Sequence, residues 1–261
     1  MSLSIYTEAV AELARIAGSN AMAYFRRQIE AEVKQDGSPV TIADKSSERL
    51  VREWVERRFP SDGVLGEEYG TRNPNAKRRW IVDPIDGTKA FIRGVPFWGS
   101  LVAVVEGETV LAGAASFPAL DETLVAGVGE GCWWNESKCA VSSVANVAEA
   151  MVLTTDVAFK DNREKQKGWL ALADAAAMSR TWGDCVGYLL VATGRAEVMT
   201  DPVISAWDVA ALMPAITEAG GVFTDWAGKP TAFGKSAIAT NAALAVESRR
   251  ILNQFSDGKS S

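Results

Sequence analysis

The feature that most constrains this chain is an apolar stretch that ends in two nearby acids, Trp80-Ile81-Val82-Asp83-Pro84-Ile85-Asp86-Gly87-Thr88. No polar residue alternates with the first three positions, which predicts a buried strand. A proline cannot continue a strand ladder and Asp-Gly-Thr is typical of a turn, so we expect Asp83 at the strand end and Asp86 in the turn beyond it. Two carboxylates in one small volume repel unless a cation lies between them. Hard oxygen ligands favour Mg²⁺, which usually keeps waters and binds substrate phosphates.

The spacing of these two acids excludes two other motifs. An EF-hand loop requires Asp-x-Asp-x-Asp-Gly, whereas here the acids stand three residues apart. Phosphatases that form an aspartyl-phosphate need an Asp-x-Asp pair, which is also absent. An ordinary turn with a solvated carboxylate is the alternative for Asp86-Gly87 taken alone, but it does not explain the whole string after a buried strand.

The composition narrows the class of protein. A chain of 261 residues allows one large domain or two lobes, and the net charge of -6 argues against a nucleic-acid partner. We expect no membrane partner, because no run approaches the roughly 18 apolar residues of a membrane span. The first residues lack the pattern of a signal peptide, and three cysteines without metal-ligand spacing suggest reduced thiols in a cytoplasm.

The chain contains no histidine. This excludes Ser-His and Cys-His nucleophilic catalysis, histidine-ligated zinc and histidine as a general base. Any catalysis must therefore use carboxylates, hydroxyls, lysines and metal.

The remaining pattern predicts stacked layers of helices and mostly antiparallel or mixed sheet. A helix is expected over residues 4–32 and antiparallel strands over 98–106, 109–117 and 122–128. Strands and helices mix without regular βαβ alternation, which argues against a doubly wound Rossmann domain. A polar, alanine-rich stretch at 142–150 predicts a boundary between lobes 1–141 and 142–255 of one domain, with a frayed tail at 256–261.

Three further acids have simple structural interpretations when each is taken alone. Asp44 opens a predicted helix and Asp208 opens another, so either could be an N-cap or a first-turn acid. Glu67 belongs to a Glu-Glu pair after a small apolar run, which would suit a solvated loop.

Taken together, the motifs resemble the inositol monophosphatase family. The matching strings are Gly66-Glu67-Glu68, Asp83-Pro84-Ile85-Asp86-Gly87-Thr88, Trp207-Asp208 and Glu218-Ala219-Gly220-Gly221, in that order. The resemblance covers nearly the whole chain. It implies an α/β fold, an αβαβα sandwich with mixed or antiparallel sheets, and Mg²⁺-dependent hydrolysis of a phosphate monoester.

The resemblance also implies roles for individual residues. Glu67, Asp83 and the carbonyl of Ile85 would bind one Mg²⁺, and Asp83, Asp86 and Asp208 a second, while Glu67 would orient a weaker third ion. Thr88, hydrogen-bonded to Asp44, would orient the attacking water. The N–H groups of Gly87 and Thr88 would meet the phosphate, and Asp208 would also face the substrate.

Local strings indicate a branch of the family. Residues 91–99, Thr181-Trp182-Gly183-Asp184-Cys185 and Asp201-Pro202 look like histidinol phosphatases, and Asp184 and Asp201 would suit a cationic substrate. Asp184 could instead only cap the following helix. An inositol-1-phosphate or broader sugar-phosphate phosphatase is the alternative enzyme, and a non-catalytic binding protein on the same fold is the competing class. The family resemblance also implies a homodimer.

Overall fold

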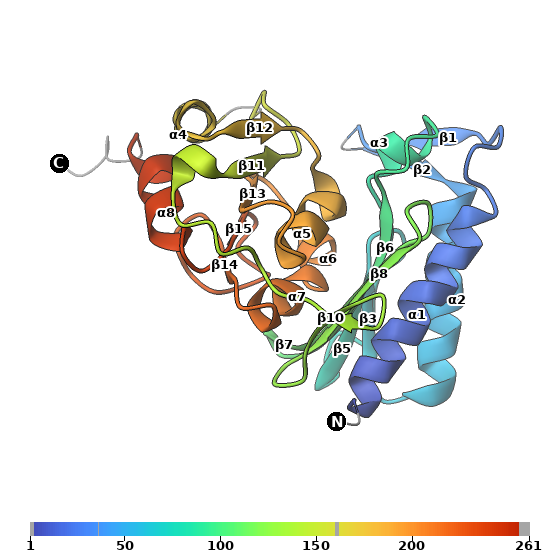
Figure 1. The fold of residues 1–261 in the computed structure, drawn as a ribbon. Helices are drawn as coiled ribbons and strands as arrows, with labels where there is room; N and C mark the ends of the chain where they lie inside the picture. Colours follow the sequence, from blue (N-terminus) through green and yellow to red (C-terminus); the bar gives the residue numbers. More distant parts are fainter. Residues whose placement is uncertain (1–2, 36, 160–161, 256–261) are drawn as a thin grey trace.

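Five alternating layers make up the protein: helices, an eight-stranded sheet, helices, a five-stranded sheet and helices (Figure 1). The computed structural model describes residues 3–35, 37–159 and 162–255. The layered mixture of α and β predicted above is confirmed. The tail expected to fray, 256–261, lies outside the described residues.

The larger sheet carries the organising motif near its middle. Its strand order is β10-β9-β8-β7-β6-β5-β3-β4, and all neighbours are antiparallel except β3 and β5. The strands are β3 (Gly63–Gly66), β4 (Gly70–Arg72), β5 (Arg78–Asp86), β6 (Gly99–Glu106), β7 (Thr109–Phe117), β8 (Glu122–Gly127), β9 (Gly131–Trp134) and β10 (Ser137–Lys138).

Two long helices, α1 (Ile5–Met22) and α2 (Ile42–Arg58), cover the outer face of this sheet. Buried alanines such as Ala14 and Ala17 let α1 lie close to the strands. The expected helix over 4–32 is too long. The chain leaves the helix after Met22, Arg26 has a left-handed backbone (φ 59°), and residues 31–33 pair with another segment as a two-stranded sheet, β1 (Ala31–Val33) and β2 (Pro39–Thr41).

The smaller sheet has the order β12-β11-β13-β15-β14. Its central strand β13 is parallel to β11 and antiparallel to β15. The strands are β11 (Met151–Thr154), β12 (Met178–Arg180), β13 (Val198–Asp201), β14 (Val222–Thr224) and β15 (Ala237–Thr240). Helices α4 (Arg163–Ala175) and α8 (Ala245–Asn253) pack together on its outer face, and the short 3₁₀-helix η1 (Val147–Glu149) precedes β11.

Helices α5 (Asp184–Ala192), α6 (Ala206–Val209) and α7 (Leu212–Glu218) fill the space between the two sheets (Figure 1). Leu189 and Leu212 share one hydrophobic core with Leu101 and Phe117 of the larger sheet. The inner helices therefore bind the sheets together. The short helix α3 (Thr88–Phe91) directly follows β5.

Two further expectations concern the limits of the chain's units. The lobe boundary predicted at 142–150 falls in the connection between β10 and β11, and its status as a folding boundary stays a prediction. In the described part of the chain, no helix is both long and apolar enough to cross a membrane.

Candidate active site

Strand β5 does not stop at Asp83 as expected. It continues to Asp86, with a shift of register against β6 between these two residues. Pro84 lies in this unpaired step, so its missing N–H removes no ladder hydrogen bond. The Ser100 hydroxyl donates to the Pro84 carbonyl over 2.6 Å, and the Ile85 N–H donates to Asp83 Oδ1 over 3.1 Å. The irregular step is thus held in place on both sides.

Asp208 arrives from the other side of the site, in the first turn of α6. The Ser205 N–H donates to Asp208 Oδ2 over 2.7 Å, and the two residues form a capping box. Asp208 therefore does take part in a helix cap, as the alternative interpretation expected, but it also belongs to the acidic cluster. Carboxylate oxygens of Asp83, Asp86 and Asp208 all lie within 4.8 Å of one another.

Three carboxylates so close together have a high electrostatic cost. Burial and the nearby Glu67, Asp86 and Asp208 raise the pKa of Asp83 well above its ordinary value. Burial raises the pKa of Asp208 to about 7, with Glu67 adding to the rise and the Ser205 N–H opposing it. The donor set is all oxygen and contributed by the ends of rigid elements. It fits a hard divalent cation, which would remove this repulsion.

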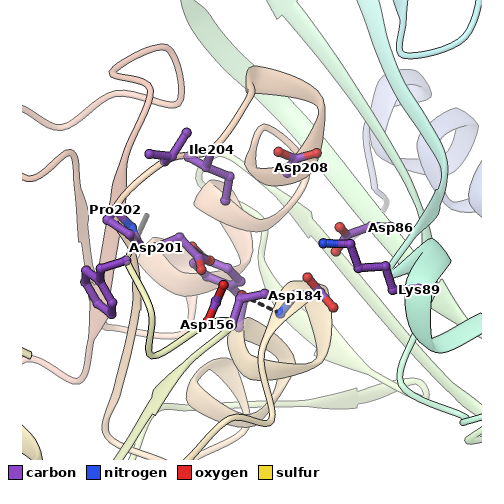
Figure 2. A pocket seen from close by; sticks show the side chains of 12 residues that line it. Asp86, Lys89, Asp156, Asp184, Asp201, Pro202, Ile204 and Asp208 are labelled. Carbon is purple, nitrogen blue, oxygen red and sulfur yellow. Dashed lines mark hydrogen bonds between the residues drawn. The ribbon is translucent and has the colours of Figure 1, made fainter. Parts of the chain in front are cut away.

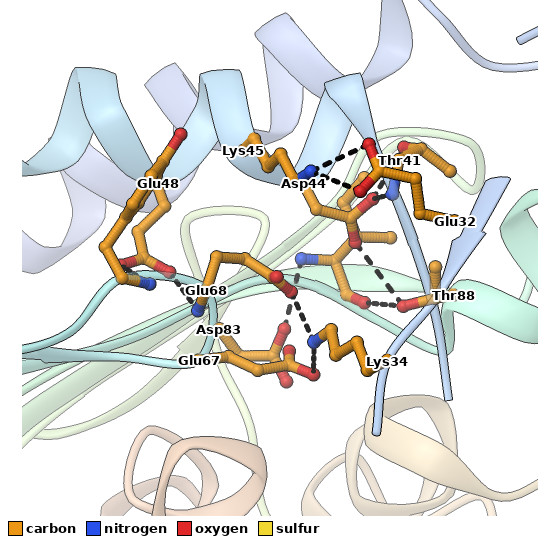
Figure 3. Close-up of polar contacts among 12 residues, drawn as sticks. Glu32, Lys34, Thr41, Asp44, Lys45, Glu48, Glu67, Glu68, Asp83 and Thr88 are labelled. Atoms are coloured by element: carbon orange, nitrogen blue, oxygen red, sulfur yellow. Dashed lines mark hydrogen bonds and ion pairs between the residues drawn. The ribbon is translucent and has the colours of Figure 1, made fainter. Parts of the chain in front are cut away.

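Glu67 follows β3, whose parallel neighbour is β5, so it reaches the same end of the sheet. It adds repulsion to the Asp83 carboxyl but lies outside the group of three. Lys34 Nζ donates to Glu67 Oε1 over 2.7 Å and to Glu68 Oε1 over 2.6 Å (Figure 3). Burial opposes the charge of Lys34, but these two bonds raise its pKa above the ordinary value. Glu67, which is expected to bind a metal ion, is thus paired with the ammonium group of Lys34.

Asp44 and Thr88 meet as predicted. Thr88 Oγ1 lies 3.4 Å from Asp44 Oδ1 and 2.8 Å from the carbonyl oxygen of Ile85 (Figure 3). Thr41, not Asp44, is the N-cap of α2, and its N–H and hydroxyl donate to Asp44 Oδ2 over 2.8 and 2.6 Å. Asp44 is fully buried, so one oxygen is fixed by the helix start and the other faces Thr88.

Gly87 allows the chain to turn from β5 into α3. It has φ 85°, and a Cβ at this position would lie 2.6 Å from the Phe97 carbonyl oxygen. Only glycine satisfies both conditions without displacement of the backbone. The turn places Gly87 and Thr88 directly after the acidic cluster.

A pocket of about 350 Å³ opens beside the cluster and is lined from both sheets. Figure 2 shows Asp86 and Lys89 on one side, Asp201 and Pro202 on the other, and Asp184 between them. Its lining residues are Asp86, Lys89, Thr155, Asp156, Phe159, Asp184, Tyr188, Asp201, Pro202, Val203, Ile204 and Asp208. It therefore contains five carboxylates and one ammonium, which suits a ligand with both anionic and cationic parts.

Asp184 is the first residue of α5, after the N-cap Gly183. Its backbone is left-handed (φ 49°), and its N–H donates to Thr155 Oγ1 over 2.9 Å. The N–H of the next residue, Cys185, donates to Asp86 Oδ2. A carboxylate of the larger sheet thus caps this helix, whereas the cap interpretation had assigned that role to Asp184. Burial, then repulsion by Asp201, raises the pKa of Asp184 to about 6, and Lys89 opposes the rise.

Asp201 ends β13 and is buried. The hydroxyl of Tyr188 donates to its Oδ2 over 2.8 Å. Burial raises the pKa of Asp201, while bonds from Thr155 and Tyr188 lower it. The carboxylate is therefore fixed at the pocket wall.

The side chains of this site that sequence reasoning missed include Lys34, Lys89, Asp156 and Tyr188. Tyr188 follows Asp184 by one helical turn, so the spacing could have indicated that both face the pocket. Lys89 adjoins Thr88 and could have been included with the motif. Lys34 and Asp156 lie in segments without a local signal, and only the tertiary fold brings them to the site.

The comparisons with known proteins agree with this geometry. The model of the inositol monophosphatase family matches residues 2–257. The chain belongs to the inositol monophosphatase family. Its curated relatives include a histidinol-phosphatase of Chlorobaculum parvum, 40% identical over 236 residues that cover 89% of this chain and 91% of the relative. A histidinol-phosphatase of Mycobacterium tuberculosis is 38% identical over 221 residues, 83% of this chain and 85% of the relative.

The solved structures agree with the family's fold. An inositol monophosphatase from Zymomonas mobilis superposes with a TM-score of 0.86 at 28% identity, covering 96% of this chain and all of that one. The αβαβα prediction is confirmed. The family and its phosphatase relatives make this protein a phosphoric monoester hydrolase.

Proposed function

We propose that the protein hydrolyses L-histidinol phosphate to L-histidinol and phosphate, a step of histidine biosynthesis, with Mg²⁺ as cofactor. The observation that carries the proposal is the cluster of Asp156, Asp184 and Asp201 on the pocket wall. Histidinol phosphate has an ammonium and an imidazole, whereas inositol phosphate has only hydroxyls, so extra carboxylates suit the former. Two relatives named histidinol-phosphatase support this choice.

Two to three Mg²⁺ ions would be bound by Glu67, Asp83, Asp86, Asp208 and the carbonyl of Ile85. Such ions lower the pKa of a bound water toward neutrality and neutralise phosphate oxygens. The raised pKa values in the cluster support the choice of ligands, because these carboxylates need a cation to ionise together.

The chain's own residues would orient the reactants. The Thr88 hydroxyl would donate a hydrogen bond to Asp44 Oδ1, so that its oxygen is free to accept one from the attacking water. The N–H groups of Gly87 and Thr88 would donate to the phosphate. Asp184 and Asp201 would accept hydrogen bonds from the substrate ammonium, while Asp208 would border both halves of the pocket.

The second candidate is an inositol-1-phosphate or broader sugar-phosphate phosphatase. The structural similarity to the Zymomonas mobilis enzyme favours it. A non-catalytic binding protein is disfavoured by the close contact of Asp83, Asp86 and Asp208, since a retired site has no physical need for carboxylates that repel.

Phosphate release from a panel of esters, with Mg²⁺ and with a chelator, tests the activity. The panel contains histidinol phosphate, inositol 1-phosphate, glycerol 2-phosphate and 3′-phosphoadenosine 5′-phosphate. We expect Mg²⁺-dependent turnover with the highest kcat/KM for histidinol phosphate. Equal kcat/KM for histidinol and inositol esters would favour the second candidate, and no turnover of any ester would favour a binding protein.

Asp184→Asn tests the proposed ammonium contact. A charge-assisted hydrogen bond contributes about 1.5–3 kcal/mol, so kcat/KM for histidinol phosphate should fall by about tenfold to hundredfold. Glycerol 2-phosphate should be almost unaffected, as should both esters in the matched variant Asp174→Asn, which removes an exposed carboxylate of α4. An equal fall for both esters would remove the reason to prefer histidinol phosphate.

Three coarser features complete the proposal. The protein would act in the cytoplasm, as a homodimer, without nucleic-acid or membrane partners. Its two lobes, 1–141 and 142–255, would form one domain, which the shared core between the sheets supports.

A further inference from the structure

Two loops form the wall of the pocket that lies away from β5. The first follows β11 and contributes Thr155, Asp156 and Phe159, and the second follows β13 and contributes residues 202–204. Because β11 and β13 are parallel neighbours, their carboxyl ends meet at one edge of the smaller sheet. The distance between the loops therefore sets the width of this part of the pocket.

Lys165, in the first turn of α4, holds the second loop. Its Nζ donates to the carbonyl oxygen of Pro202 over 2.9 Å and lies 4.9 Å from the centre of the Trp226 ring. Burial lowers the pKa of Lys165, and Asp225 opposes that change. Partial burial of an ammonium group costs hydration energy. Here the Pro202 carbonyl and the face of the Trp226 ring offset part of that cost.

Gln166, the next residue of α4, holds the first loop. Its Nε2 donates to the carbonyl oxygens of Val157 and Ala158, over 2.9 and 3.2 Å. The same loop contains Phe159, which is buried despite a left-handed backbone (φ 47°) and packs edge-on against Trp226 at 6.1 Å. One indole thus contacts both the ring of the first loop and the ammonium that binds the second.

We propose that Lys165 and Gln166 are positioning residues that fix the two wall loops at the spacing required by the organic half of the substrate. The inference rests on the proposed phosphatase function and deepens it. Neither side chain lines the pocket, so both act through the backbone of the loops. Val203, next to the tethered Pro202, is 75% exposed, so contacts of its own side chain do little to hold this loop.

The bond to Pro202 matters because that residue directly follows Asp201. A movement of the carbonyl would change where Pro202 and Val203 lie, while Asp201 stays fixed by Tyr188. Ile204 is held separately, because its N–H donates to the carbonyl oxygen of Lys235 over 3.1 Å. The phosphate end should change less, because Asp83, Asp86, Gly87 and Thr88 lie in or directly after β5. Asp208 follows the second loop, but its carboxylate is held separately by the Ser205 N–H. Loss of the tether should therefore impair recognition of the organic group and spare hydrolysis itself.

The test compares wild type with Lys165→Met, Lys165→Arg and Lys167→Met, the last a matched change at an exposed lysine of the same helix. For each, kcat and KM are measured with histidinol phosphate and with glycerol 2-phosphate, together with the unfolding temperature. In Lys165→Met we expect the ratio of the two kcat/KM values to fall about tenfold, mainly through a higher KM for histidinol phosphate. Lys165→Arg should recover most of the ratio, and Lys167→Met should match wild type.

An equal loss for both esters, or an arginine variant no better than methionine, would overturn the positioning role. Gln166→Leu tests the first loop, and the ratio of the two kcat/KM values should fall by a similar factor. An unchanged ratio in this variant would contradict the positioning role of Gln166. If wild type prefers another ester of the panel, the proposed substrate is wrong, and the same ratio is then measured with the preferred ester. The two failures are therefore distinguishable.

Discussion

Among single residues, Asp83 is a buried carboxylate that is repelled by three others, Glu67, Asp86 and Asp208. Asp83→Asn should reduce Mg²⁺-dependent turnover by at least about a hundredfold, because it would weaken two ion sites at once. The metal-free variant should be as stable as wild type or slightly more so, since a repulsive charge is lost. Activity and chemical unfolding, both measured with and without Mg²⁺, check this. Turnover near that of wild type at saturating Mg²⁺ would contradict the assignment of Asp83.

The hydroxyl of Thr88 gives a second prediction at this scale. Thr88→Ala should lower kcat strongly with little change in KM, because the hydroxyl acts on the attacking water and not on the bound ester. Thr88→Ser keeps the donor and should retain much more activity. Steady-state kinetics of the two variants decide the matter. If they behave alike, Thr88 is only a turn residue and its contact with Asp44 has no catalytic role.

The string around Asp83 was sufficient to predict a buried strand followed by two nearby carboxylates and a turn at Gly87, and the family resemblance added the Thr88–Asp44 contact. It was not sufficient to predict that Asp86 accepts a hydrogen bond from Cys185, which lies 99 residues later. The bond between Lys34 and Glu67 was also missed. Both contacts depend on how distant elements pack, and nothing in the local residue pattern encodes that arrangement.

Among the elements, α7 lies very close to β7 at Gly113. A Cβ there would lie 2.3 Å from the Ala211 carbonyl oxygen and 2.6 Å from its Cα. Gly113→Ala should therefore lower the free energy of unfolding by about 1–3 kcal/mol. It should also weaken Mg²⁺ activation, because Asp208 lies three residues before Ala211. Urea unfolding and Mg²⁺ titration of activity check this. The matched change Thr109→Ala, at an exposed position of the same strand, should affect neither.

Sequence patterns located the apolar elements well and their ends less well. The bounds of β7 agree with the expected strand 109–117, and β6 and β8 differ from the expected 98–106 and 122–128 by one residue each, because each is an apolar run between turn residues. The first helix was predicted too long, since helical spacing continues beyond Met22 while tertiary pairing draws residues 31–33 into β1. Asp83 was expected at a strand end, yet the register shift lets β5 accommodate Pro84 and continue.

For the whole molecule, the acidic cluster predicts a dependence of stability on pH. Folding raises the pKa of Asp184 to about 6 and that of Asp208 to about 7, so between about pH 4 and 7 the metal-free folded state binds more protons than the unfolded state. Its stability should then fall by several kcal/mol as the pH rises through this range, since each unit of pKa difference corresponds to about 1.4 kcal/mol.

Mg²⁺ should reverse this loss, because it binds the ionised carboxylates of the folded state only. The increase in unfolding temperature on addition of Mg²⁺ should therefore be small at pH 5 and large at pH 8. Calorimetry at several pH values, in chelator and in Mg²⁺, measures both trends. A metal-free stability that rises from pH 5 to 7 would show that the cluster does not control the pH dependence.

The site is assembled from two sheets, and this arrangement has a consequence for how such enzymes diverge. Asp83 and Asp86 lie in one strand of the larger sheet and Thr88 lies just after it, whereas the wall facing the organic group comes from short loops after β11 and β13. A duplicated gene could accumulate changes in those loops alone, and its product would accept a new ester while the hydrolytic chemistry stayed intact. Substrate specificity and the hydrolytic mechanism can therefore evolve independently.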